Sequence, residues 1–94
     1  MPRLLTPDEV TRQLADLDGW EREGDEIHRS VELADFAAAL DFVVSVGHEA
    51  EGMNHHPDID LRWNLVRLAV STHSEGGLTQ LDIELAHRVD SLLS

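Results

Sequence analysis

Apolar residues recur every three or four positions in three segments of the chain, which is the spacing of an amphipathic helix. This pattern predicts helices over residues 7–18, 36–54 and 80–92. Asp18-Gly19 ends the first helix, and Pro57 limits the second because the residue before a proline disfavours helical geometry. Each predicted helix follows a residue that can cap its N-terminus, namely Thr6, Asp35 or Thr79.

The second predicted helix is apolar over most of its surface. One stripe with a 3.6-residue period consists of Phe36, Leu40, Val43, Gly47 and Ala50. Phe42, Val44 and Val46 widen this stripe almost all round. A helix of this kind lies in the middle of a fold or at a subunit interface.

Four shorter segments alternate apolar and polar residues with a period of two, which is typical of strands with one buried face. They are residues 20–23, 27–33, 58–63 and 66–73. Gly24-Asp25 and Asn64-Leu65 provide turns that join them into two hairpins. Arg29 is an exception, because it falls on the apolar face of the second segment.

The predicted element order is helix, hairpin, helix, hairpin, helix. Two hairpins can join into one four-stranded antiparallel sheet, and helices must cover a face of it because each has an apolar side to bury. We therefore expect an α+β fold, a two-layer sandwich in α-β-β-α-β-β-α order. With 94 residues, positions 1–94 are expected to form a single domain. A core this small favours oligomerisation.

The charge of the chain excludes several classes of partner. Nineteen acidic residues stand against seven arginines and no lysine, and the net charge is −12. Such a surface repels phosphate backbones and anionic lipid, so we expect no direct nucleic-acid or membrane binding. There is no cysteine for disulfides or thiolate chemistry. No stretch resembles a signal peptide or a membrane span, and the expected location is cytoplasmic.

Candidate chemistry is concentrated between Glu51 and Asp82. His55 and His56 fall in the last turn of the second predicted helix, and Glu51 lies four residues before His55 on the same face. The helix dipole and Glu51 both favour a protonated imidazole there. His73 ends the fourth predicted strand, before a glycine-containing loop. If the second hairpin folds beside the helix end, the three histidines could converge and act as acid and base.

Three interpretations of these residues remain open. In the first they are structural: a helical His-Glu pair is usually a surface ion pair, Asp82 caps the third helix, and Trp63 belongs to the core. In the second they transfer protons on a neutral small molecule without a metal or a covalent step. In the third they bind zinc, although His55 and His56 would point about 100° apart on a helix.

A longer pattern contains all of these residues. It reads Glu51, three residues, His55-His56-Pro57, five residues, Trp63, nine residues, His73, eight residues, Asp82. This pattern resembles the signature of the pterin-4a-carbinolamine dehydratases, and the similarity extends over nearly the whole chain. The resemblance implies a four-stranded antiparallel sheet, in agreement with the predicted element order.

The resemblance also implies a reaction and a site. Enzymes of this family dehydrate 4a-hydroxytetrahydropterin to quinonoid dihydropterin in tetrahydropterin recycling, with no metal or organic cofactor. By resemblance the catalytic residues are His55, His56 and His73. Pterin contacts are expected from Glu51, His55, His56, Pro57, Thr72, His73, Ser74 and Glu75, with Asp82 and Trp63 supporting the site. We expect His55 or His56 to protonate the leaving hydroxyl and His73 to act as the base.

The family resemblance implies partners as well. The pterin substrate is released by aromatic amino acid hydroxylases, and family members form homodimers or homotetramers. Animal members of the family also act as dimerisation cofactors of a transcription factor, and some relatives resemble assembly factors for other enzymes. The alternative function is therefore a non-catalytic interaction protein on the same fold.

Overall fold

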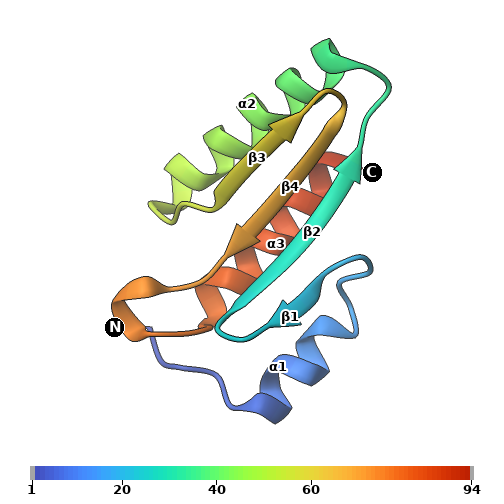
Figure 1. The fold of residues 1–94 in the computed structure, drawn as a ribbon. Helices are drawn as coiled ribbons and strands as arrows, with labels where there is room; N and C mark the ends of the chain where they lie inside the picture. The colour runs from blue at the N-terminus through green and yellow to red at the C-terminus, as the bar shows by residue number, and fades with distance from the viewer. Residues whose placement is uncertain (1, 94) are drawn as a thin grey trace.

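The computed structural model describes residues 2–93 and contains three helices and four strands in the predicted order (Figure 1). The elements are α1 (Pro7–Leu14), β1 (Glu21–Glu23), β2 (Glu26–Glu32), α2 (Phe36–Met53), β3 (Asp58–Arg62), β4 (Leu65–Val70), the short 3₁₀ helix η1 (His73–Glu75) and α3 (Gln80–Leu93). The sheet is antiparallel, with strand order β1-β2-β4-β3. The predicted α+β fold is thus confirmed.

One face of the sheet is covered by helices. Ile27 pairs with Val70 and Val31 with Val66 across the central β2–β4 pair, and all four side chains are buried. Figure 1 shows α2 and α3 behind the sheet, with α1 beside β1. Apolar side chains of α2 and α3 complete the core over this face. The molecule therefore has two layers, and the site residues lie where strand ends meet helix ends.

Arg29 lies on the buried face of β2 because α3 offers it a partner. Its guanidinium NH1 donates to Asp90 Oδ1 at 2.6 Å, and Trp20 Nε1 donates to the same oxygen at 2.9 Å. The interruption of the apolar alternation at Arg29 is therefore an ion pair that ties β2 and Trp20 to α3.

The first helix is shorter than predicted. Its capping box is present as expected, with Thr6 and Glu9 bonding reciprocally, but α1 ends at Leu14 rather than at Asp18. Tighter bonds follow, from Leu17 N to Leu14 O and from Trp20 N to Leu17 O. These turns bury Leu17 without continuing the helix.

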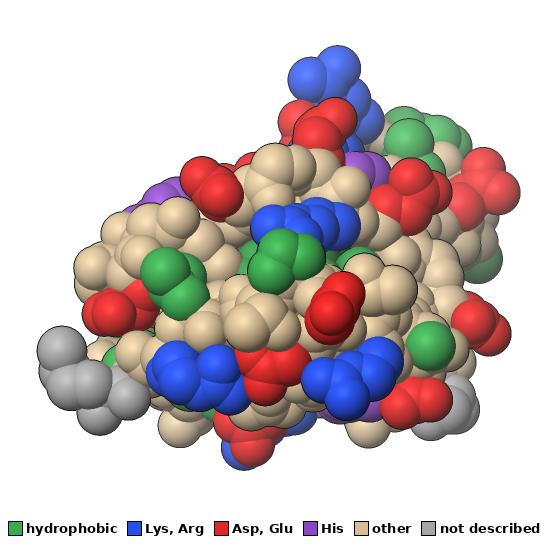
Figure 2. All heavy atoms as spheres, turned by 90° about the horizontal axis from the view of Figure 1, so that it is seen from below, with side chains coloured by type: hydrophobic (Ala, Val, Ile, Leu, Met, Phe, Trp, Pro, Cys, Tyr) green, Lys and Arg blue, Asp and Glu red, His purple; other side chains and the backbone are tan. Residues whose placement is uncertain are grey.

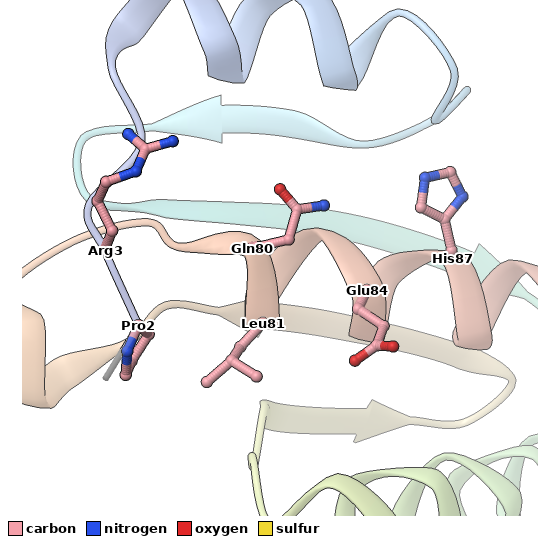
Figure 3. Close-up of a pocket in the computed structure, with 6 residues that line it drawn as sticks. All are labelled: Pro2, Arg3, Gln80, Leu81, Glu84 and His87. Carbon is pink, nitrogen blue, oxygen red and sulfur yellow. The ribbon is translucent and has the colours of Figure 1, made fainter.

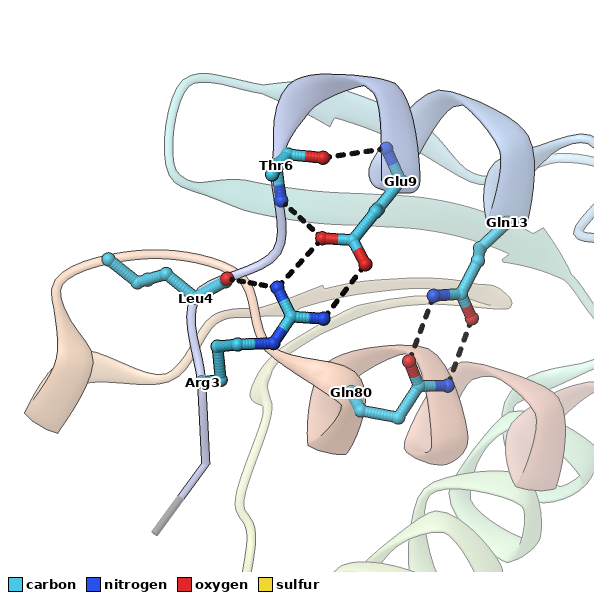
Figure 4. Close-up of polar contacts among 6 residues, drawn as sticks. All are labelled: Arg3, Leu4, Thr6, Glu9, Gln13 and Gln80. Carbon is cyan, nitrogen blue, oxygen red and sulfur yellow. Dashed lines mark hydrogen bonds and ion pairs between the residues drawn. The ribbon is translucent and has the colours of Figure 1, made fainter.

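The N-terminal segment is held against the start of α3 (Figure 4). Leu5 N donates to Leu78 O at 2.9 Å, and the amides of Gln13 and Gln80 bond reciprocally. Arg3 makes two bonds to the Glu9 carboxylate, at 2.8 and 2.9 Å. The Arg3 guanidinium, helped by the Thr6 backbone N–H, lowers the pKa of Glu9 to about 2.

The buried face of α2 differs from the predicted stripe. Its buried residues are Ala39, Phe42, Val46 and Ala50. Phe36 and Leu40 are each 45 % exposed and Val44 is 51 % exposed. The helix thus buries this set of residues and leaves an apolar stripe, Phe36–Leu40–Val44, on the surface. The pattern is apolar on both sides, so the sequence alone could not distinguish them.

The prediction that Trp63 lies in the core is wrong. The turn between β3 and β4 is Trp63-Asn64, one residue earlier than expected, and Trp63 is 68 % exposed at a positive φ of 52°. Asn64 is held by Leu33: its Nδ2 donates to Leu33 O at 2.9 Å, and Leu33 N donates to Asn64 O at 2.8 Å. Trp63 occupies the left-handed position of this turn, and its side chain is exposed.

Acidic and arginine side chains are interspersed on the surface seen in Figure 2, without a continuous basic patch. Among the helices of residues 2–93, none combines the length and the apolar character that crossing a bilayer requires.

Candidate active site

The end of α2 determines where His55 and His56 lie. Asn54 adopts a left-handed conformation (φ 50°, ψ 43°), and its N–H bonds back to Glu51 O at 3.2 Å. His55 N bonds to Ala50 O at 3.1 Å. This pair of bonds is a Schellman motif, which terminates a helix. The prediction that both histidines occupy the last helical turn is therefore wrong, because they follow the helix in an irregular segment.

His55 points into the protein and pairs with Asp82 of α3. Its Nε2 lies 2.6 Å from Asp82 Oδ1, and the two side chains are 10 % and 0 % exposed. The predicted pairing of His55 with Glu51 is therefore wrong. With α2 ended at Met53, the four-residue helical relationship no longer applies to His55.

Glu51 pairs with His56 instead. His56 Nε2 lies 2.5 Å from Glu51 Oε2, and the side chains are 54 % and 77 % exposed. The site thus contains two histidine–carboxylate pairs in different surroundings. One is buried and rigidly held, and the other is open to solvent.

Asp82 is bonded on both of its oxygens. Its Oδ2 accepts from Thr79 N and from Thr72 Oγ1, each at 2.9 Å, while Oδ1 faces His55. The bond to Thr79 N is the helix-capping role expected of Asp82. The same carboxylate also links His55 to Thr72, which spacing alone did not show. No buried side-chain nitrogen or oxygen among residues 2–93 lacks a hydrogen-bond partner.

His73 follows Thr72 directly. β4 ends at Val70, and the isolated bridge between Thr72 and Gly77 closes a small loop in which residues 73–75 form η1. The His73 side chain is exposed, and its ring has no hydrogen-bond partner among residues 2–93. His73 is therefore free to meet a ligand.

Two segments of the site run side by side. Asp58 pairs with Ala69 in the β3–β4 ladder, so the residues before Asp58 approach the residues after Ala69. The Asp82 bridge between His55 and Thr72 joins the same two segments. The structure thus places segment 55–57 beside segment 72–73, and the convergence of the three histidine rings stays a prediction.

The remaining predicted residues are placed differently. Pro57 is half-buried, Ser74 is exposed, and Glu75 is half-buried with its Oε2 3.4 Å from Ser74 Oγ. Trp63 follows β3, whereas His55 and His56 precede it, so this five-residue strand of roughly 3.3 Å per residue separates them. Trp63 therefore does not join the histidines within one chain.

The zinc interpretation depends on a cluster of ligands. In the described part of the chain, no three His, Asp or Glu side chains are grouped so that they could hold a metal ion.

A separate hollow of about 440 Å³ lies beside the start of α3 (Figure 3). It is lined by Pro2, Arg3, Gln80, Leu81, Glu84 and His87. None of the predicted site residues lines it. Arg3 and Gln80 are already bonded to Glu9 and Gln13. The site therefore rests on the histidine–carboxylate arrangement and not on this hollow.

The chemical capacity of the arrangement is proton transfer. It offers one buried histidine held by a carboxylate, one exposed histidine beside a carboxylate, and one histidine without a partner. Histidine is the side chain best suited to give and take protons near neutral pH.

Comparison with known proteins identifies the family. The family model described as pterin 4 alpha carbinolamine dehydratase matches residues 3–92. A relative from Roseiflexus castenholzii, provisionally named a pterin-4-alpha-carbinolamine dehydratase, is 46 % identical over 93 residues, covering 99 % of this chain and 100 % of the relative. A protein of the same provisional name from Mycobacterium tuberculosis (strain H37Rv) is 45 % identical over 89 residues, covering 95 % of each.

Solved structures agree with this assignment. A crystal structure described as a transcriptional coactivator/pterin dehydratase from Brucella melitensis superimposes with a TM-score of 0.94 at 34 % identity, covering 98 % of this chain and 100 % of that one. A pterin dehydratase-like RuBisCO assembly factor of the alpha-carboxysome shares the fold, with a TM-score of 0.64 at 18 % identity over 78 % and 84 % of the two chains. The chain belongs to the pterin-4a-carbinolamine dehydratase family.

Proposed function

We propose that the protein dehydrates a 4a-hydroxytetrahydropterin to the quinonoid dihydropterin and water. The observation on which this rests is the meeting of segments 55–57 and 72–73, where His55 is bonded through Asp82 to Thr72, next to His73. Family membership supports the same substrate class.

The reaction needs one base and one acid. The base removes the proton from N5 of the pterin, and the N5 electron pair forms the N5=C4a double bond. The C4a–O bond breaks at the same time, and the acid protonates the departing hydroxyl so that it leaves as water. Each positioned proton transfer contributes roughly 10² to 10⁴ in rate.

The three histidines divide this work in the proposal. His73, which has no partner among residues 2–93, is the base that takes the N5 proton. His55 or His56 is the acid, since each has a carboxylate that compensates the positive charge of an imidazolium. In this division the histidines alone exchange protons with the pterin.

A direct assay tests the proposal. The 4a-carbinolamine is generated in situ by a phenylalanine hydroxylase, and its ultraviolet decay is followed with and without the chelator-treated protein. We expect acceleration in the parent and its loss in His55→Ala and His73→Ala. His87→Ala, an exposed histidine on α3, serves as the matched control and should retain full activity. Decay at the buffer rate with the parent protein would overturn the proposal.

A second function, as an interaction protein, is favoured by one observation. The stripe Phe36–Leu40–Val44 is about half exposed, and apolar patches of this kind often mark contacts with other chains. The stripe suits the expected homodimer or homotetramer and also a different protein partner.

The two uses of the stripe can be separated by light scattering. If it joins copies of this chain, Leu40→Glu should reduce the molar mass in solution while the helical circular dichroism is retained. Thr11→Glu, on the exposed side of α1, is the control and should leave the mass unchanged. An unchanged mass in Leu40→Glu would exclude self-association through the stripe.

A further inference from the structure

The donors around Asp82 determine which atoms carry the hydrogens in its hydrogen bonds. The Thr79 backbone N–H can only donate, and it bonds to Oδ2 at 2.9 Å. The Thr72 hydroxyl donates to the same oxygen at 2.9 Å. Asp82 also lies in the first turn of α3, where the helix dipole favours a negative charge. The carboxylate is thus an acceptor on both oxygens.

The two threonine hydroxyls must then point in one direction. Thr72 has a single hydroxyl hydrogen, and Asp82 receives it. The 2.8 Å contact between Thr72 Oγ1 and Thr79 Oγ1 therefore uses the hydrogen of Thr79. Thr79 Oγ1 in turn accepts from Leu81 N at 3.2 Å. The chain of bonds runs from Leu81 N–H through Thr79 and Thr72 to Asp82.

The direction of these hydrogen bonds determines which ring nitrogen of His55 carries the hydrogen. Because Asp82 Oδ1 accepts, the hydrogen in its 2.6 Å contact with His55 belongs to Nε2. In a neutral ring Nδ1 is then without a hydrogen, and no group among residues 2–93 bonds to it. Nδ1 is therefore the one nitrogen of His55 that has no partner among residues 2–93.

The exposed pair lacks this support. The Glu51 side chain is 77 % exposed and has no hydrogen bond besides that to His56 among the described residues. No other hydrogen bond within residues 2–93 therefore holds the Glu51 carboxylate in one orientation, and the exposed pair does not confine His56 to one tautomer.

We infer that Thr79 and Thr72 are positioning residues: their hydroxyls orient Asp82 so that His55 exchanges its proton through Nδ1 alone. The effect on the tautomer follows from the geometry, and the effect on rate rests on the proposed dehydratase function. The two threonines act on His55 through Asp82.

The tautomer can be measured without any enzyme assay. Long-range ¹H–¹⁵N correlation spectra of the ¹⁵N-labelled full chain, at mildly alkaline pH, distinguish Nε2–H from Nδ1–H rings. We expect His55 to show the Nε2–H pattern in the parent and a mixture of tautomers in Thr72→Val and Thr79→Val. Thr72→Ser and Thr79→Ser, which keep the hydroxyl, should restore the parent pattern. An Nδ1–H pattern in the parent would overturn the inference whether or not any variant folds.

Kinetics provide the second readout. Removing the partner that orients a metal-bound histidine costs about 10-fold to 100-fold in activity, and we expect a loss of the same order in kcat, with little change in KM, for both valine variants. The serine variants should recover most of it, and Thr11→Val, whose exposed hydroxyl bonds to Pro7 O, should match the parent. Valine variants with the parent tautomer and the parent kcat would refute the positioning role. A parent with the Nε2–H pattern and no dehydratase activity would refute the proposed function and leave the geometry of His55 intact.

Discussion

His55 Nε2 lies 2.6 Å from Asp82 Oδ1, although 27 residues separate them along the chain. The contact joins the segment after α2 to the first turn of α3. It holds a histidine of the family signature against a fully buried carboxylate. Asp82 therefore stabilises the start of a helix and orients a candidate catalytic ring at the same time.

Asp82→Asn should weaken both the start of α3 and the orientation of His55. The amide has one acceptor oxygen in place of two, so it cannot accept both from the threonine donors and from His55 Nε2–H. We expect a loss of about 1–3 kcal/mol in the free energy of unfolding, measured by urea denaturation. Activity should fall about 100-fold or more at substrate saturation, because His55 loses its orienting acceptor.

The control for this prediction is Asp58→Asn, an exposed carboxylate at the start of β3. It should change the unfolding free energy by less than about 0.5 kcal/mol. Equal stability and equal kcat for Asp82→Asn and the parent would show that Asp82 neither stabilises the start of α3 nor orients His55.

Glu51→Gln should affect stability much less than Asp82→Asn. The Glu51–His56 pair is exposed on both sides, and exposed ion pairs contribute about 0–1 kcal/mol. We expect a small change in unfolding free energy that shrinks further in high salt. Urea denaturation of parent and variant at low and high ionic strength measures it, and a loss as large as that in Asp82→Asn would refute this ranking.

The Arg3–Glu9 pair should make stability depend on pH in the acidic range. The Arg3 guanidinium lowers the pKa of Glu9 from 4.5 to about 2 in the folded protein. A lowered folded-state pKa contributes stability that is present above the unfolded-state pKa and is lost as pH falls through the folded-state value. Glu9→Gln should therefore be less stable than the parent at neutral pH, and the difference should disappear between about pH 4.5 and pH 2.

Thermal unfolding of both proteins across this pH range provides the measurement. Salt should reduce the difference at neutral pH, because Arg3 is exposed. A constant difference between parent and Glu9→Gln from neutral to strongly acid pH would show that the pair does not titrate in this way.

Much of the fold follows from local rules in the sequence. The caps at Thr6 and Asp35 begin helices as predicted, and the period-two pattern of Val66, Leu68 and Val70 identifies a strand with one buried face. These features depend only on neighbouring residues. They could be predicted because the physical cause and its effect lie in the same segment.

The sequence-based predictions are wrong where a contact with a distant residue determines the local structure. Leu33, which directly follows β2, bonds to Asn64 in the turn that exposes Trp63, and no local pattern indicates this long-range contact. Phe36 and Ala39 lie on different faces of α2, and only the position of the sheet determines which face is buried.

In the candidate site, too, local features could be predicted from the sequence and long-range contacts could not. The family signature selected His55, His56, His73 and Asp82, but the spacing paired Glu51 with the wrong histidine. The correct pairing depends on a left-handed residue, Asn54, that ends α2 one residue before His55. Thr79 was predicted only as a helix cap, and its place in the hydroxyl chain depends on Thr72 in the segment after β4.

Asn54 provides the last prediction, because its conformation places both histidines. Its φ of 50° lies in the left-handed region, which asparagine and glycine tolerate and alanine does not. Asn54→Ala should cost about 1–2 kcal/mol in the free energy of unfolding, whereas Asn54→Gly should stay close to the parent. If the alanine variant instead continues α2, His55 is carried away from Asp82, and activity should fall in Asn54→Ala and be retained in Asn54→Gly. Urea denaturation and the carbinolamine assay on the two variants measure both effects. Equal behaviour of alanine and glycine at this position would show that the end of α2 does not depend on the left-handed turn.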